Sequence, residues 1–195
     1  NVPESRLYLY ENGEAIEKYR VAIGMESHET PPGAFRVTHA IWNPWWHPPD
    51  SEWARDRSVE PPGSPTNPMG RIKLHFAELL YIHGTPEEET LGLMVSRGCV
   101  RMSNAELIEL TRYLHGHFAP HVSTALMDRL VANPRQTRQV NFRRAIPFEV
   151  IYRVAEVREG QLFIFPDVYG QVGSRLEEHV TATLLENGVD LASVD

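Results

Sequence analysis

The chain opens with short alternating strands separated by turn residues, and this pattern constrains its fold more than any other feature. Arg6 to Tyr10 alternates in polarity, Asn12-Gly13 is a strong hairpin-turn signal, and Tyr19 to Ile23 supplies a second strand. After the turn at Pro31-Pro32-Gly33, a third strand is predicted over Ala34 to His39. Consecutive strands of this kind predict a mainly β protein.

Further strands are predicted in the middle of the chain and near its end. Ile72 to Phe76 and Leu79 to His83 have the length and apolar character of buried strands. Phe148 to Val157 and Gln161 to Phe165 read as a closing hairpin around the turn at Glu159-Gly160. We therefore expect two packed mixed sheets that form a β-sandwich curled toward a barrel, with a few peripheral helices.

Helix signals are few and local. Thr85-Pro86-Glu87-Glu88 and Ser103-Asn104-Ala105-Glu106 both match the capping-box pattern. We expect a short helical turn after the first and a longer helix after the second. Thr124 to Ala132 predicts a helix that stops before Pro134, and Ser174 to Asn187 predicts an amphipathic one.

A length of 195 residues fits one domain with a sizeable core. We expect the main domain to span residues 1–170, with a loop at 42–70 and a helical insertion at about 115–134. Residues 171–195 are expected to form a C-terminal amphipathic helix packed on the same domain.

The loop at 42–70 is rich in proline and holds all four tryptophans of the chain, Trp42, Trp45, Trp46 and Trp53. Disordered linkers rarely hold so many large aromatic residues, so we expect an ordered loop packed on the sheet. The rings either form a satellite core or line a substrate groove.

Charge and hydropathy exclude some classes of partner. The formal net charge of −7 argues against nucleic acid, which requires a basic surface. An arginine cluster lies in residues 131–146 and reads either as a solvated face or as a contact for an anionic polymer; its members are Arg135, Arg138, Arg143 and Arg144. No apolar run is long enough for a transmembrane helix, and the first residues lack the apolar segment of a signal peptide.

The only cysteine, Cys99, follows Gly98 in a polar turn, and His83 lies sixteen positions upstream. A lone Cys is most often a small buried hydrophobe. Here the polar neighbours and the glycine, which allows close approach of a substrate, favour a reactive thiol instead. A cysteine with a nearby histidine is the minimum apparatus for acyl transfer through a thioester.

These residues carry a resemblance to a known family. His83-Gly84-Thr85, a spacer, and then Ser96 to Asn104 (Ser-Arg-Gly-Cys-Val-Arg-Met-Ser-Asn) resembles the signature of the L,D-transpeptidase catalytic (YkuD) family. Four further motifs occur in the same order as in that family: Leu7 to Gly13, Thr30 to Phe35, Asn67 to Gly70 and Phe163 to Gly170. The resemblance therefore covers roughly residues 6–170.

The resemblance implies a cysteine-dependent enzyme of the cell envelope or periplasm. Cys99 would form a thioester with a peptidoglycan tetrapeptide stem and release D-Ala, with His83 as the base. An amine from a second stem would then complete a 3–3 cross-link, a reaction sensitive to carbapenems. Alternatives are hydrolysis of the same acyl-enzyme, as an L,D-carboxypeptidase or stem-peptide amidase, and a non-catalytic peptidoglycan-binding module.

The same resemblance implies roles for the residues around the thiol. The oxyanion and turn residues are Gly98, Arg97 and Ser96, and the substrate-binding residues are Arg101, Gly84, Tyr81 and Asn104. Many members of the family have His at the position of Arg97, so its charge is expected to raise the thiolate fraction instead. Arg101 fits either a stem-peptide carboxylate or a salt bridge that holds the turn.

Histidines 115, 117 and 121 suggest a metal site, but zinc needs three or four converging ligands and this segment has no Cys. We expect no metal and no cofactor. The expected partners are peptidoglycan stem peptides.

Overall fold

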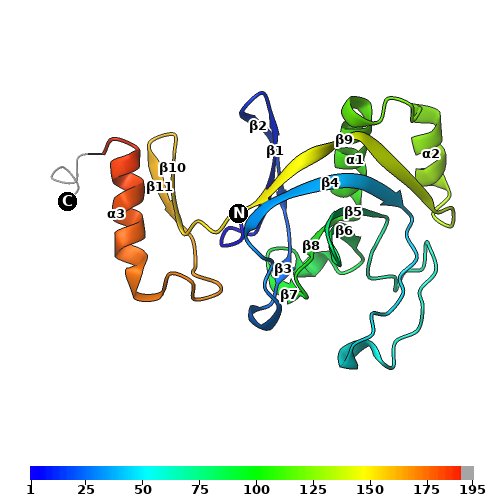
Figure 1. Ribbon diagram of the computed structural model, residues 1–195, viewed down its shortest axis with the longest axis horizontal. Coiled ribbons are helices and arrows are strands. Elements are labelled where there is room, and N and C mark those ends of the chain that lie inside the picture. Colours follow the sequence, from blue (N-terminus) through cyan, green and yellow to red (C-terminus); the bar gives the residue numbers. More distant parts are fainter. Residues whose placement is uncertain (190–195) are drawn as a thin grey trace.

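A computed structural model describes residues 1–189 and confirms a mainly β protein with few helices (Figure 1). Its largest sheet has five strands in the order β8-β6-β5-β4-β9. The bounds of these strands are Val100–Ser103, Leu80–Thr85, Ile72–Ala77, Gly33–Trp42 and Arg138–Val150. Since β6 and β8 are parallel and the other pairs are antiparallel, the sheet is mixed.

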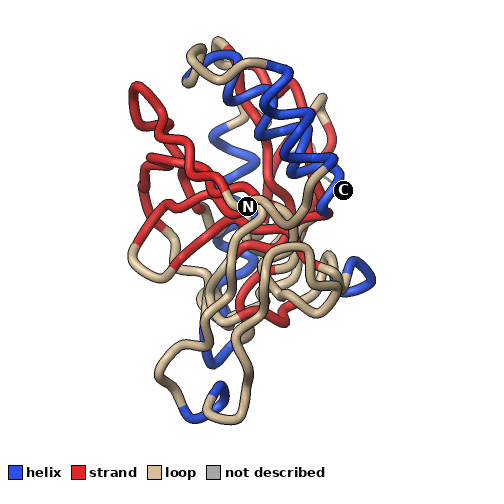
Figure 2. Tube along the Cα trace, turned by 90° about the vertical axis from the view of Figure 1, so that its right-hand side faces the viewer, coloured by secondary structure: helices blue, strands red, loops and turns tan. Residues whose placement is uncertain are grey.

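Three two-stranded sheets accompany it. They pair β1 (Arg6–Glu11) with β2 (Glu14–Arg20), β3 (Ile23–Gly24) with β7 (Met94–Ser96), and β10 (Ala155–Arg158) with β11 (Gln161–Ile164). An antiparallel bridge between Ala22 and Arg101 joins the segment between β2 and β3 to the free edge of β8. The five-stranded sheet and the β1–β2 and β3 strands contribute to one core, to which, within residues 1–189, β10 and β11 do not belong. Figure 2 shows the strands clustered beside the helices.

The helices are α1 (Asn104–Phe118), α2 (Thr124–Ala132) and α3 (Leu176–Glu186), with short 3₁₀ turns at Glu26–His28, Glu52–Ala54, Glu88–Thr90 and Gly173–Arg175. The first two helices match the expected helical segments. Among the described residues, no helix has both the length and the apolar character needed to cross a membrane.

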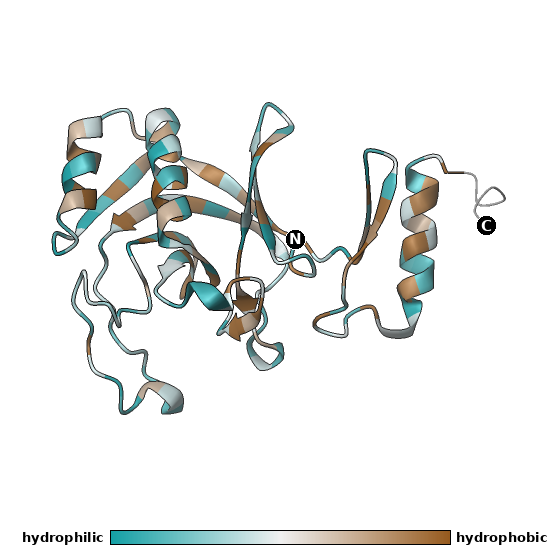
Figure 3. Cartoon of the chain, turned by 180° about the vertical axis from the view of Figure 1, so that it is seen from behind, coloured by the Kyte–Doolittle hydropathy of each residue, from teal (hydrophilic) through white to brown (hydrophobic). Residues whose placement is uncertain are grey.

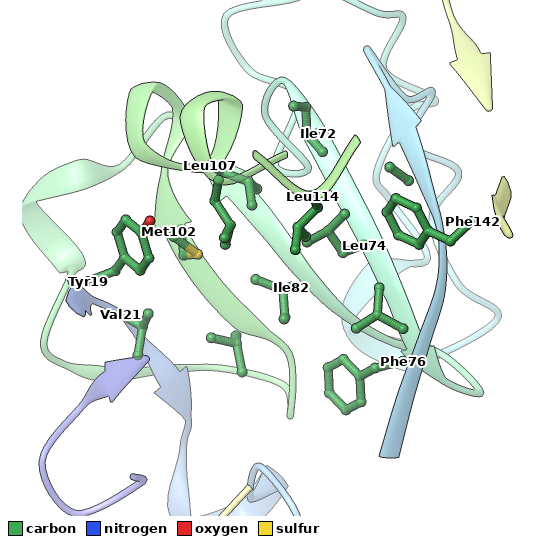
Figure 4. Packing of buried hydrophobic residues seen from close by; sticks show 14 of the residues in the cluster. Tyr19, Val21, Ile72, Leu74, Phe76, Ile82, Met102, Leu107, Leu114 and Phe142 are labelled. Carbon is green, nitrogen blue, oxygen red and sulfur yellow. The ribbon is translucent and has the colours of Figure 1, made fainter. Parts of the chain in front are cut away.

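Strand alternation separates the two faces of β5, β6 and β8. Successive side chains on a strand point to opposite faces. The even-numbered residues Leu74, Ile82 and Met102 are buried in the core, where they meet Leu107 and Leu114 of α1 (Figure 4). Burial of large apolar side chains against a helix is the main stabilising term of such a layer. The odd-numbered residues are left to the opposite face.

The carboxylate of Glu88, in the 3₁₀ turn after β6, caps α1. Ser103, expected to close a capping box with Glu106, makes no side-chain bond to the helix N-terminus. Instead Glu88 accepts hydrogen bonds from Asn104 N at 3.1 Å and from Ser103 Oγ at 3.0 Å. A carboxylate at this position satisfies free N–H groups and the helix dipole. The expected local capping box is wrong because Glu88 takes its place.

Two strand boundaries also correct the expectations. Strand β9 runs over Arg138–Val150, so Phe148 ends this strand and does not start the closing hairpin. The hairpin is limited to β10 and β11. Strand β4 continues to Trp42, which is fully buried, so this tryptophan belongs to the sheet core and not to the loop.

The remaining tryptophans of the loop differ in exposure. Trp46 is buried, while Trp45 and Trp53 are exposed. The loop is ordered by its own contacts, since Asn67 Nδ2 donates to the carbonyls of Pro44 at 2.9 Å and Pro61 at 3.2 Å.

The C-terminal elements form a separate layer. Helix α3 contacts β10 and has no buried residue, and Figure 1 shows this helix and its hairpin beside the main body. Figure 3 shows hydrophobic residues along both α3 and the hairpin. The division at residue 170 stays a prediction, and residues 190–195 of the expected 171–195 region lie outside the described residues.

Candidate active site

Strand register brings the predicted site residues onto one face of the large sheet. His83 on β6 pairs with Arg101 on β8 and with Lys73 on β5. Cys99 directly precedes β8 and shares the parity of Arg101, and Tyr81 shares the parity of His83. We call this set, together with His75, which pairs with Tyr81, the site face. Neighbouring strands lie about 4.8 Å apart, and residues two positions apart on one strand are about 6.7 Å apart. From this spacing, the backbone of Cys99 lies about 8 Å from the backbone of His83, on the diagonal across the two strands.

A glycine turn presents the cysteine. Gly98 has φ of 96°, a left-handed conformation that favours glycine, and it links β7 to Cys99. Ser96 Oγ donates to the Cys99 carbonyl oxygen at 2.6 Å and so closes the turn. Ser96 is buried and Cys99 is partly exposed. The turn therefore holds the thiol at the surface of the site face.

The thiol lies against the backbone of β6. Cys99 Sγ is 3.6 Å from the carbonyl oxygen of Leu79, to which it donates. Burial raises the pKa of Cys99 above its ordinary value, and the Tyr81 backbone N–H and the charges of Arg101 and Lys73 oppose that shift. The raised pKa keeps the sulfur as a thiol in the free protein near neutral pH.

His83 is buried and uncharged. Its Nδ1 lies 2.7 Å from the Gly84 carbonyl oxygen, and because a carbonyl only accepts, Nδ1 carries the proton. Nε2 is then the basic nitrogen. Burial lowers the pKa of His83 to about 4, against the raising effect of the Gly84 carbonyl; the charges of Arg101 and Lys73 lower it further.

Arg101 is held by an acid. Its Nη1 forms a salt bridge of 3.0 Å with Oε2 of Glu87, in the loop after β6. Arg101 Nε is buried and has no hydrogen-bond partner among the described residues. The structure thus shows the salt bridge, one of the two roles expected for this residue.

Asn104 and two glycines fix the loop beside His83. Asn104 Oδ1 accepts from Arg71 N at 2.7 Å, and its Nδ2 donates to the Thr85 carbonyl at 2.8 Å. A Cβ on Gly70 or Gly84 would collide with the Asn104 side chain. Asn104 and Gly84 therefore position the backbone that orients the histidine.

Arg97 points to the tryptophan loop. Its guanidinium lies 4.4 Å from the centre of the Trp53 ring, and its Nη1 is 3.5 Å from Nε2 of His28. The positive charges that lower the Cys99 pKa are those of Arg101 and Lys73. The Trp53 ring thus contacts Arg97, which lies two residues before Cys99, and a tryptophan at a substrate groove stays a prediction.

Lys73 also lies on the site face, although it was not predicted from the sequence. Its ammonium lies 4.6 Å from the centre of the Tyr81 ring, and its strand β5 pairs with β6, the strand that carries Tyr81 and His83. The signal was present, because Lys73 interrupts the apolar residues of the predicted strand at Ile72 to Phe76. Only the pairing of β5 with β6 shows that its side chain shares the face of His83.

The histidines of α1 are engaged elsewhere. His115 Nε2 accepts from Trp42 Nε1 at 2.9 Å inside the core, and His117 Nδ1 lies 2.9 Å from the Tyr113 carbonyl. Within residues 1–189 no group of three or more His, Cys, Asp or Glu residues is placed to hold a metal ion.

Comparisons with known proteins agree on one family. A model of the L,D-transpeptidase catalytic domain (YkuD) matches residues 1–136. A probable L,D-transpeptidase ErfK/SrfK of Salmonella typhimurium is 33% identical over 139 residues, which cover 67% of this chain and 44% of that protein. The putative L,D-transpeptidase YqjB of Bacillus subtilis is 38% identical over 98 residues, 47% of this chain and 51% of that protein.

Among solved structures, the LD transpeptidase LdtMt1 in complex with imipenem is similar to this chain with a TM-score of 0.45 and 16% identity, over 57% of this chain and 51% of the other. The chain spans less than half the length of the ErfK/SrfK relative.

Proposed function

Because the chain belongs to the L,D-transpeptidase catalytic domain family, we propose that it is a cysteine acyltransferase that acts on peptidoglycan stem peptides. One observation supports the proposal: the partly exposed Cys99, directly before β8, and the buried, uncharged His83 on the adjacent β6 lie on one face of the sheet. The site of action that fits such a substrate is the cell envelope.

The first step is acylation of Cys99. As the sulfur attacks the carbonyl of the third stem residue, its proton passes to Nε2 of His83. The tetrahedral intermediate then collapses, the bond to the terminal D-Ala breaks, and the histidine returns that proton to the leaving amine. The products are a thioester on Cys99 and free D-Ala.

The turn supports this step with backbone donors. Gly98 adopts a left-handed φ, and this conformation can direct consecutive N–H groups toward one point, as in an oxyanion hole. We assign the developing oxyanion to the N–H groups of Gly98 and Cys99. Removal of one such donor typically costs roughly 10²–10³ in rate.

The second step transfers the acyl group to an amine. His83 takes a proton from the attacking amine of a second stem, the new amide forms, and the sulfur leaves and recovers a proton. The product is a 3–3 cross-link. Water in place of the amine would yield a tripeptide stem, so the acceptor is the part of the proposal that an assay must separate.

Incubation with purified disaccharide-tetrapeptide, followed by mass spectrometry, tests the proposal. We expect a dimer that lacks one D-Ala, and a covalent adduct at Cys99 after carbapenem treatment. Cys99→Ala should lose both, with an unchanged unfolding temperature, because the thiol's hydrogen bond to the Leu79 carbonyl oxygen is long, at 3.6 Å. Tripeptide alone would redirect the proposal to hydrolysis. Turnover by Cys99→Ala would overturn it.

A further inference from the structure

Lysine is rare in this chain, and one of its two lysines lies on the site face. Lys18 is on β2 and Lys73 is on β5, against a background rich in arginine. Lys73 is half-buried, and within residues 1–189 its ammonium makes no salt bridge and no hydrogen bond. A half-buried ammonium without an acid is costly unless a ligand supplies the anion.

The position of the ammonium follows from the strand register. Lys73 pairs with His83, and Tyr81 lies two residues before His83 on the same face. The ammonium leans over the Tyr81 ring at 4.6 Å, which holds it by a cation–π contact and directs it along β6 toward the level of Cys99. The backbone N–H of Tyr81 in turn faces the Cys99 sulfur.

Two positive charges act on the thiol, those of Arg101 and Lys73, and of these Lys73 has no acid partner among the described residues. His83 is uncharged because burial lowers its pKa to about 4. Arg101 is paired with Glu87 at 3.0 Å. Lys73 acts on the site at short range, since its charge lowers the pKa of Cys99 and the thiolate in turn raises the pKa of Lys73 against the effect of burial.

We propose that Lys73, supported by the Tyr81 ring, forms a carboxylate-binding subsite beside Cys99. An ammonium is a compact point charge with freely rotating donors, which suits a single carboxylate that approaches along the sheet face. Under the proposed function, on which the identity of the ligand rests, the carboxylate belongs to the donor stem peptide next to the bond that is cut.

Two alkylating reagents of equal size test the subsite without any peptidoglycan. Iodoacetate carries a carboxylate and iodoacetamide is neutral, so the ratio of their rates with Cys99 reports an anion-binding group beside the sulfur. We expect Lys73→Gln to lower the iodoacetate-to-iodoacetamide ratio by about 3- to 10-fold. Lys73→Arg should keep most of the ratio, and added salt should reduce it in the native protein.

Lys18→Gln is the matched control, because it removes the other lysine from an exposed strand far along the chain from the site. Its ratio should equal that of the unaltered protein, and all variants are compared by thermal unfolding. An unchanged ratio in Lys73→Gln, with normal iodoacetamide labelling, would overturn the subsite and leave the proposed function standing.

A cysteine that reacts with neither reagent in the native protein, even at high pH, would overturn both proposals.

A second measurement links the subsite to substrate. Donor stems with a free and an amidated carboxylate are compared by kcat/KM, and the preference for the free acid should shrink about 3- to 10-fold in Lys73→Gln.

Discussion

The protonation states of Cys99 and His83 set how the proposed reaction starts. Burial raises the pKa of the thiol and lowers the pKa of the imidazole to about 4, so both groups are uncharged near neutral pH. The pair therefore differs from a preformed thiolate–imidazolium pair. Proton transfer has to accompany attack on the carbonyl, which makes the basicity of Nε2 part of the chemical step.

The histidine gives a prediction for the pH profile. His83 acts as a base only when neutral, and its pKa of about 4 keeps it neutral over most of the acidic range. We expect the acid limb of kcat/KM to lie near pH 4 instead of near the ordinary histidine value of about 6.5. A limb near pH 6.5 that disappears in His83→Gln would contradict the burial argument.

At the scale of elements, the turn between β7 and β8 depends on Gly98. Its φ is 96°, and an added Cβ would lie 3.1 Å from Leu80 Cδ2 and 3.3 Å from the Glu29 carbonyl oxygen. Both the backbone conformation and the contacts oppose any larger residue.

We expect Gly98→Ala to destabilise the protein by about 1–3 kcal/mol and to slow acylation of Cys99 by a carbapenem. Gly116→Ala is the matched control. Gly116 lies inside α1 with open space around its Cβ position, so alanine there should stabilise the helix by about 0.5–1 kcal/mol. Urea unfolding and mass spectrometry check both variants, and a Gly98→Ala protein as stable as the native one would refute the strain argument.

Elements differed in how far the sequence predicted them. The hairpin at Asn12-Gly13 and the helix over Thr124 to Ala132 are confirmed, because their signals are local. Strand β9 was missed because this edge strand carries exposed arginines in place of an apolar run. The Glu88 cap was missed for a different reason: it joins residues 16 positions apart, which no local pattern records.

In the site, too, local sequence signals were predictive and long-range pairing was not. Cys99 and His83 were predicted as catalytic from motif and spacing, and the structure places His83 on β6 and Cys99 directly before the adjacent strand β8. Lys73 was not predicted, since its place beside them depends on which face β5 presents once it pairs with β6.

At the scale of the whole molecule, two buried histidines make stability depend on pH. His83 and His115 both have a pKa of about 4, chiefly because of burial, against about 6.5 in the unfolded chain. A depressed histidine pKa means that the unfolded state binds more protons between pH 6.5 and pH 4. The stabilising contribution is therefore complete above pH 6.5 and is lost as the pH falls toward 4.

His115→Gln tests this prediction, since a glutamine oxygen can still accept the Trp42 Nε1 bond that His115 accepts at 2.9 Å. Between pH 7 and pH 5 the native protein should lose about 2 kcal/mol more unfolding free energy than this variant. Urea titrations at the two pH values measure the difference. Equal losses would show that His115 is not held neutral by the fold.

The division between the two faces of β5, β6 and β8 has a consequence for how such a protein can diverge. Leu74, Ile82 and Met102 are constrained by packing in the core, while their neighbours Lys73, Tyr81 and Arg101 lie on the site face and are free of that constraint. Exchange of one set leaves the other in place, so ligand preference can drift without loss of the scaffold. A shift of one residue in the pairing register of a strand would have the opposite effect. It would turn the polar side chains of the site face into the core and the apolar side chains out of it.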